Sequence, residues 1–160
     1  MEPFDKLIKE YYVPDVPTEV VMYLHMASHK IISKTEEISE RFGITRAQFN
    51  ILNILYNQYP QTATVNLLRE RTLVVKSDVS RIVMRLQKAG LIDCTVNKND
   101  RRSFDILINE KGRSLFDEVV KHKEELLKPF LAFSSEEIAQ LKSTLRKLLA
   151  ELEKENGAKV

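Results

Sequence analysis

The fold is decided by residues 65–108, VNLLRERTLVVKSDVSRIVMRLQKAGLIDCTVNKNDRRSFDILI. A short helix over 65–71, a turn at 72–75 and a second helix over 76–89 predict a helix-turn-helix. After Gly90 the apolar period changes: apolar and polar residues alternate in 91–96 and again in 103–108, which predicts two β-strands. The polar residues 97–102, which we call the wing, join them and predict a hairpin.

The second helix of this motif has two chemically different sides. At 100° per residue its apolar residues gather on one side, and hydroxyl, guanidinium and ammonium groups with one methionine gather opposite them. Arginine can bond guanine through two hydrogen bonds, and hydroxyls can reach base edges or phosphates. An ordinary amphipathic surface helix shows the same division, so this helix alone does not establish DNA binding. Its candidate DNA-binding residues are Lys76, Ser77, Ser80, Arg81, Met84, Arg85 and Lys88.

The wing adds cations at an exposed tip. Arginine is drawn into a narrow minor groove by the negative potential there. Asp100 stands beside two arginines, where it can hold one guanidinium in place while the other inserts. A solvated turn is the alternative reading of the same residues. The wing residues expected to contact DNA are Lys98, Asn99, Asp100, Arg101 and Arg102.

The positive charge of the chain is concentrated around this motif. The 160 residues carry a net charge of only +2, but residues 61–102 hold nine Lys or Arg against four Asp or Glu. A local basic region in a nearly neutral protein indicates a polyanionic partner. The single cysteine, Cys94, excludes an intramolecular disulfide. The charged N-terminus lacks the apolar centre of a signal peptide, so a cytoplasmic protein without membrane contact is expected.

Helices are expected on both sides of the motif. Apolar residues three and four apart predict helices over 18–42 and 45–59, the second with a capping box of Thr45 and Gln48. Gly43 and Gly90 are expected to end helices. A helix over 110–128 is expected to stop before Pro129, and Ser134 with Glu137 predicts a capping box for a last helix that ends near residue 155.

Three stretches together resemble one known family. They are KSDVSRIVMRLQKAGLI (76–92), NKNDRRS (97–103) and INEKGRSLFDEV (108–119). Their order and spacing are similar to the MarR family of bacterial winged helix-turn-helix regulators over residues 45–125. Each motif alone is weak, but the combination is specific.

The resemblance implies a mainly α fold with a small β-hairpin. Residues 45–108 would form the DNA-binding region, and residues 1–44 and 109–160 would form a dimerisation region. It further implies a homodimer on a palindromic operator, with residues 76–88 in the major groove and Arg101 or Arg102 in the minor groove, braced by Asp100. Family members are commonly repressors released by a small ligand, for which phenol-like compounds are expected. No cofactor is expected.

Several positions depart from the family pattern. The turn before the second helix usually has a glycine near Leu73 and a serine cap near Val75. Either Ser77 caps a slightly shorter helix here, or the turn has a different form. Met84 stands where an aspartate is common, and Asn97 begins the wing where an aspartate is usual.

Other functions fit the sequence less well than DNA binding does. A winged-helix module for protein contacts needs no cationic wing, and no glycine-rich phosphate loop or nucleophile motif supports an enzyme. His25 and His29, with His122 as a third ligand, would suit a metal-responsive regulator, but a helix surface is the simpler interpretation. Cys94 is expected to be a small core residue rather than a redox thiol. An effector site, whose residues the sequence does not identify, could use the aromatic residues Tyr11, Tyr12, Tyr23, Phe49 and Tyr56.

Overall fold

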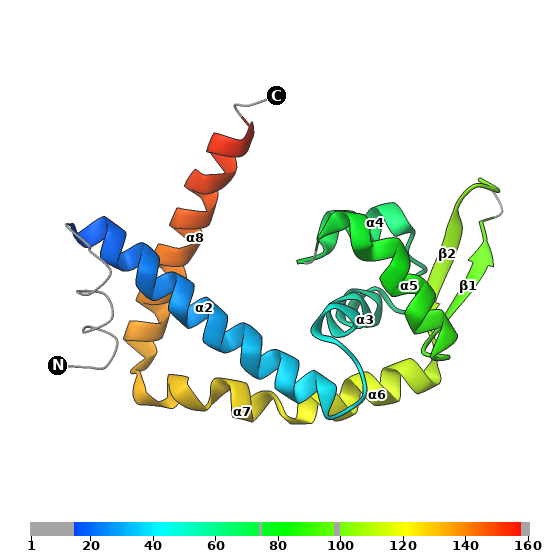
Figure 1. Ribbon diagram of the computed structural model, residues 1–160, viewed down its shortest axis with the longest axis horizontal. Coiled ribbons are helices and arrows are strands. Elements are labelled where there is room, and N and C mark those ends of the chain that lie inside the picture. Colours follow the sequence, from blue (N-terminus) through cyan, green and yellow to red (C-terminus); the bar gives the residue numbers. More distant parts are fainter. Residues whose placement is uncertain (1–14, 74, 98–99, 158–160) are drawn as a thin grey trace. The chain divides into compact units, whose positions relative to one another are not determined.

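The computed structural model of the chain describes residues 15–73, 75–97 and 100–157, which form helices and one two-stranded antiparallel sheet (Figure 1). They fall into two compact units, divided between His122 and Lys123. The elements are α2 (Val16–Glu40), α3 (Arg46–Gln58), α4 (Val65–Arg71), the 3-10 helix η1 (Lys76–Asp78), α5 (Val79–Lys88), β1 (Ile92–Val96), β2 (Phe104–Ile108), α6 (Glu110–Lys121), α7 (Lys123–Leu127), the 3-10 helix η2 (Lys128–Ala132) and α8 (Ser135–Gly157).

Helix α3 is the centre of the first unit. It contacts α2, α4, α5, α6 and β2. Ile51, Leu52 and Leu55 on this helix are almost completely inaccessible to solvent. Since a buried aliphatic side chain contributes about 1.5–3 kcal/mol, this helix holds the elements around it together.

The local signals for the start and end of helices are confirmed. Gly43 and Gly90 have φ of 71° and 69°, the left-handed conformation that suits glycine at a helix end. Thr45 and Gln48 form the capping box: Oγ1 of Thr45 accepts the backbone N–H of Gln48 at 3.2 Å, and Oε1 of Gln48 accepts that of Thr45 at 2.9 Å. Thr64 caps α4, where its Oγ1 accepts the backbone N–H of Leu67 at 3.2 Å.

The hairpin follows the predicted alternation. Strands β1 and β2 pair antiparallel, with Ile92 opposite Ile108, Cys94 opposite Ile106 and Val96 opposite Phe104. The isoleucines are buried, whereas Val96 and Phe104 at the wing end are exposed. The inner face of the hairpin therefore enters the core only at the end remote from the wing.

The long helix predicted over 110–128 is interrupted. Helix α6 ends at Lys121, α7 follows from Lys123 to Leu127, and η2 from Lys128 contains Pro129. At the interruption, the ring of His122 lies against that of Phe42, with centroids 5.3 Å apart. The first helix also differs at both ends. It begins at Val16, where Oδ1 of Asp15 accepts the backbone N–H of Thr18 at 3.0 Å, and it ends at Glu40.

The second unit contains α7, η2 and α8. As predicted, Ser134 and Glu137 form a capping box at the start of α8, with hydrogen bonds of 2.8 and 3.2 Å. Leu141, Leu148 and Leu152 on α8 are exposed within the single chain. Among the helices of the described residues, none combines the length and apolar content that a membrane span requires.

Gly112 joins the start of α6 to the end of α5. Oδ1 of Asn109 accepts the backbone N–H of Gly112 at 3.0 Å, and Nδ2 of Asn109 donates to the carbonyl of Gly90 at 3.1 Å. A Cβ on Gly112 would lie 2.1 Å from the carbonyl oxygen of Leu91 and 2.8 Å from Cγ1 of Ile108. Only glycine permits this approach of backbone to backbone.

We therefore expect Gly112→Ala to destabilise the protein. Alanine in a helix interior would gain about 1 kcal/mol over glycine, but the clash with a backbone carbonyl outweighs this gain. A clash with backbone places the overpacking cost at the upper end of its usual range, about 3 kcal/mol, so the expected net loss is about 2 kcal/mol after the gain of about 1 kcal/mol. Urea unfolding at one fixed protein concentration measures it, with Ser114→Ala on the same helix as the control. Unchanged or increased stability of Gly112→Ala would contradict the close approach.

Candidate nucleic-acid interface

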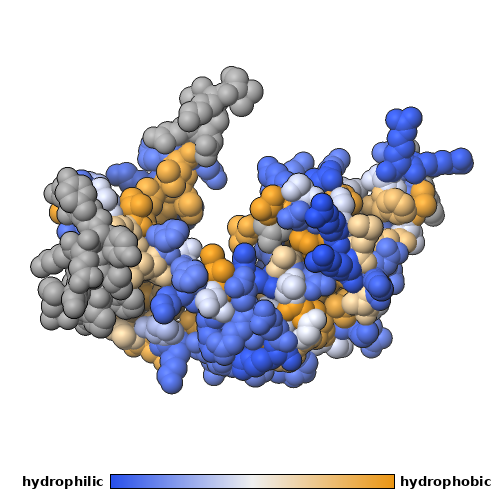
Figure 2. All heavy atoms as spheres, in the orientation of Figure 1, coloured by the Kyte–Doolittle hydropathy of each residue, from blue (hydrophilic) through white to orange (hydrophobic). Residues whose placement is uncertain are grey.

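Helix α5 has the two sides that its sequence predicts. Val79, Ile82, Val83 and Leu86 are all buried in the first unit. The outer side of α5 (Arg81, Met84 and Lys88, with Arg85 beside them) is exposed. Hydrophilic atoms with hydrophobic atoms between them cover the surface over α4 and α5 (Figure 2).

The structure of the turn before α5 decides between capping by Ser77 and a turn of different form. The first residues, Lys76–Asp78, form the 3-10 helix η1, and neither η1 nor α5 begins with a side-chain cap. Capping by Ser77 is therefore wrong, and the turn has its own form. Oδ1 of Asn50 on α3 accepts the Thr72 hydroxyl at 2.8 Å and the backbone N–H of Leu73 at 3.1 Å. This anchor does not depend on a glycine in the turn.

Ser80 is occupied by a contact within the unit. Its Oγ accepts a hydrogen bond of 3.1 Å from Nη2 of Arg69, and Nη1 of Arg69 donates to Asn66 at 3.3 Å. The pair ties α4 to α5, so the two helices of the motif keep a fixed relation. Sequence reasoning missed Arg69 and Asn50, since each acts on a partner eleven or more residues away.

The wing turn is held by short-range hydrogen bonds. Oδ1 of Asp100 accepts the backbone N–H of Arg102 at 2.9 Å, and the N–H of Asp100 donates to Oδ1 of Asn97 at 2.9 Å. Nδ2 of Asn97 in turn donates to Asp105 on β2 at 2.8 Å. Arg101 and Arg102 are exposed. Lys98 and Asn99 lie outside the described residues.

The histidines and the cysteine show no arrangement for metal or redox chemistry. His25 and His29 are exposed on α2. The described residues contain no group of three or more His, Cys, Asp or Glu side chains that could hold a metal ion. Burial raises the pKa of the half-buried Cys94 thiol, and the nearby Asp93 carboxylate raises it further. A raised pKa leaves less of the reactive thiolate at neutral pH, which fits a structural residue.

The aromatic residues considered for an effector site that the structure describes do not form one group. Tyr11 and Tyr12 lie outside the described residues. The rings of Phe49 and Tyr56 stack on Phe116, with centroids 5.4 and 4.3 Å away. Tyr23 lines a separate cavity with Met26, Ala27 and Lys30. Phe49 and Tyr56 are thus packed against α6, and no local pattern in the sequence indicates Phe116 as their common partner.

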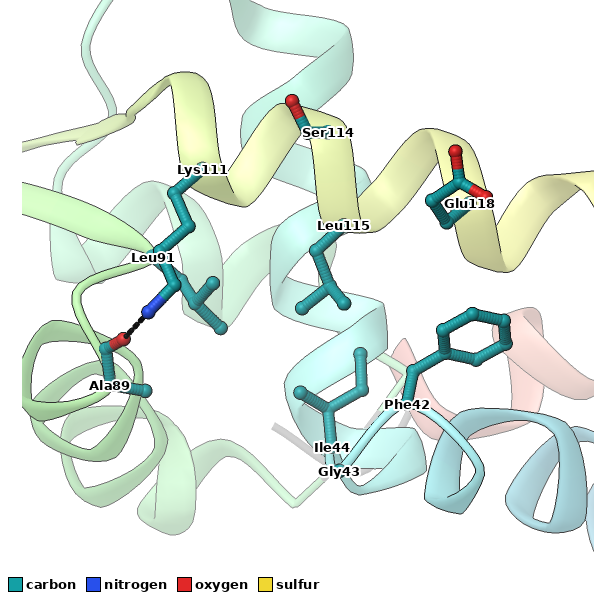
Figure 3. Close-up of a pocket in the computed structure, with 9 residues that line it drawn as sticks. All are labelled: Phe42, Gly43, Ile44, Ala89, Leu91, Lys111, Ser114, Leu115 and Glu118. Atoms are coloured by element: carbon teal, nitrogen blue, oxygen red, sulfur yellow. Dashed lines mark hydrogen bonds between the residues drawn. The ribbon is translucent and has the colours of Figure 1, made fainter.

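A larger cavity lies where α6 passes the end of α5 and the loop between α2 and α3 (Figure 3). Its volume is about 390 Å³, within the usual range for small-ligand sites. Nζ of Lys111 donates to the carbonyl of Ala89 at 2.9 Å, at the end of α5. Sequence reasoning missed this cavity because its walls come from distant segments. They include Phe42, Ile44, Leu91, Leu115 and Glu118.

Comparison with known proteins shows which family the chain resembles. The model of the MarR family matches residues 42–103. YsmB of Bacillus subtilis, an uncharacterized HTH-type transcriptional regulator, is 30% identical over 125 residues, which are 78% of this chain and 84% of YsmB. The HTH-type transcriptional repressor MdtR of the same species is 29% identical over 120 residues, 75% of this chain and 76% of MdtR.

One similar solved structure is a complex with DNA. The crystal structure of the S. aureus MepR–DNA complex matches with a TM-score of 0.75 and 26% sequence identity, over 82% of this chain and 96% of the MepR chain. The predicted fold class, mainly α with a winged helix-turn-helix, is confirmed by this match and by the hairpin and helices above.

Proposed function

The chain belongs to the MarR family and is a DNA-binding transcriptional regulator rather than an enzyme, and from this we propose that it acts as a homodimeric repressor that a small ligand releases. The observation that carries the DNA-binding part of this function is the division of α5. Its apolar side is buried, and its cationic side is left for the major groove. The exposed arginines of the wing give a second, separate point of contact.

The proposed interface includes all twelve residues that the sequence indicated. On η1 and α5, Arg81 is proposed to bond a base edge, while Lys76, Ser77, Arg85 and Lys88 meet bases or phosphates. Ser80, whose Oγ accepts a hydrogen bond from Arg69, is proposed to contact DNA from that position. In the wing, Arg101 or Arg102 enters the minor groove beside Lys98 and Asn99. The contact that Asp100 makes with the backbone of Arg102 supports a fixed turn. The proposed bracing of a guanidinium by Asp100 is part of the same interface.

Exposed apolar faces support the homodimer. Within α2, the buried residues are Ile38 and Ser39 only, while Val20 and Ile31 on its apolar face are exposed. Leu141, Leu148 and Leu152 on α8 are exposed as well. Large exposed apolar faces on helices of a soluble regulator favour association. We therefore propose residues 1–44 and 109–160 as the dimerisation region around a DNA-binding region at 45–108.

The cavity beside α5 supports release by a ligand. A small molecule with an apolar body can contact Leu91 and Leu115, and an acceptor on it can compete with the carbonyl of Ala89 for Lys111. Loss of that hydrogen bond would loosen the end of the DNA-reading helix. The name of MdtR, a repressor, supports repression as the mode of action.

A protein-contact module is the alternative function, and DNA-binding assays separate the two. We expect the wild type to bind the region upstream of its own gene, or fragments of a genomic pool, with a log–log salt slope of about −0.9 per phosphate contacted. Arg101→Ala/Arg102→Ala should lose at least tenfold in affinity, because both cations leave the wing. Arg146→Ala/Lys147→Ala on α8 removes the same charge elsewhere and is the control. Equal losses of DNA affinity in both double variants would mean that only the total charge of the protein matters, and would contradict the proposed contact of the wing.

For the dimer, sedimentation at micromolar concentration should give twice the chain mass of 18.6 kDa. Val20→Asp places a charge on the apolar face of α2 and should shift the protein towards monomer, because burying an unpaired carboxylate is costly. Ser33→Asp adds the same charge on the opposite side of α2 and should leave the mass unchanged. A wild-type mass of one chain would contradict the dimer.

For the ligand, Leu115→Trp should fill the cavity without touching the outer side of α5. We expect this variant to bind DNA but to resist release by a panel of small phenols that release the wild type. Leu115→Met, which keeps the volume, should respond as the wild type does. Release of the Leu115→Trp complex at wild-type ligand concentrations would place the effector elsewhere.

A further inference from the structure

Two large apolar side chains stand among the cations that are proposed to face DNA. Met84, on the outer side of α5, is 61% exposed, and Val75, just before η1, is 67% exposed. Single exposed apolar residues are common on protein surfaces. These two differ because Met84 follows Arg81 by three residues and Val75 directly precedes Lys76, and both of these cations are proposed to meet a polyanion.

We propose that Met84 and Val75 read the C5-methyl groups of thymines in the major groove, so that the preferred operator carries thymines at the positions beneath them. This inference rests on the proposed function of α5 and adds to it the base that these two positions select.

The chemistry of the major groove identifies the partner. Thymine alone among the four bases presents a methyl group there, while the other edges present hydrogen-bond donors and acceptors. Neither Met84 nor Val75 can satisfy such donors and acceptors with a strong hydrogen bond. An apolar contact with a methyl group is the favourable interaction left to them, worth about a fourfold change in affinity per methyl removed from water.

The backbone that carries both side chains is held in place. The carbonyl of Val75 accepts the backbone N–H of Asp78 at 3.0 Å, which fixes Val75 to the first turn of the DNA-reading segment. The preceding part of the turn is anchored by Asn50. Met84 lies within α5, and its unbranched thioether side chain can adapt to the methyl that it meets.

The helix also predicts where one thymine lies. Met84 follows Arg81 by three residues, about 4.5 Å along the helix axis, on the same side. Successive base pairs are about 3.4 Å apart. The thymine read by Met84 should therefore lie within about two base pairs of the base that Arg81 reads.

Replacing thymine by deoxyuridine tests this directly, because it removes the methyl group and keeps both hydrogen-bonding edges. The operator is first obtained by selection from a random duplex pool with the wild-type protein. Each thymine of one half-site is then replaced singly. Affinities are measured for the wild type, Met84→Gln, Met84→Leu, Val75→Ser and Arg101→Ala. Because both substituted positions are exposed, the variants are expected to fold.

We expect at least one deoxyuridine substitution to weaken wild-type binding by about three- to fivefold, in line with the methyl term above. Met84→Gln or Val75→Ser should abolish the preference at its own position. Met84→Leu should keep this preference. Arg101→Ala should weaken binding to the thymine operator and to its deoxyuridine counterpart by the same factor.

Two results would overturn the inference while leaving the proposed function intact: equal wild-type affinity for all substituted operators, or a preference that Met84→Gln and Val75→Ser both retain. Failure of the wild type to select any duplex would instead overturn the proposed function, and this inference with it.

Discussion

The burial of one side of α5 against the first unit is the interaction on which the rest of the structure depends. Val79 and Leu86 have no accessible surface, and Ile82 and Val83 have little. Each buried aliphatic side chain contributes about 1.5–3 kcal/mol, whereas a typical hydrogen bond contributes about 0.5–1.5 kcal/mol. Burial therefore decides the rotation of α5, and that rotation decides that Arg81 and Met84 point outward. The bonds of Arg69 and Asn50 then hold the preceding segment in place.

Features set by neighbouring residues could be predicted from the sequence. The two sides of α5, the hairpin and the capping box of Thr45 depend on periods and on partners three residues away, which the sequence shows directly. The 3-10 helix η1, the interruption at His122 and the cavity beside Lys111 could not be predicted. The last two bring together segments far apart in the chain, through the ring contact of His122 with Phe42 and the hydrogen bond from Lys111 to Ala89.

The wing contains a local contact that charge alone does not predict. Asp100 is proposed to brace a guanidinium, and its Oδ1 also accepts the backbone N–H of Arg102, two residues away. An exposed ion pair is worth about 0–1 kcal/mol after the loss of side-chain freedom. A bond to the adjacent backbone orders only the short aspartate side chain, and such turns are a common role of aspartate. The turn therefore forms without either guanidinium, and both remain exposed for a partner.

Helix α2 buries little of its length within a single chain. Helix α2 has 25 residues, yet only Ile38 and Ser39 near its end are buried in the first unit. An isolated helix in water is marginally stable, and most helical stability in proteins comes from packing an apolar face. In the proposed dimer, association supplies that packing, so the stability of α2 depends on protein concentration. Since α2 leads directly into α3, which carries the core beneath α5, dimerisation and the order of the DNA-reading surface are then linked through one continuous stretch of chain.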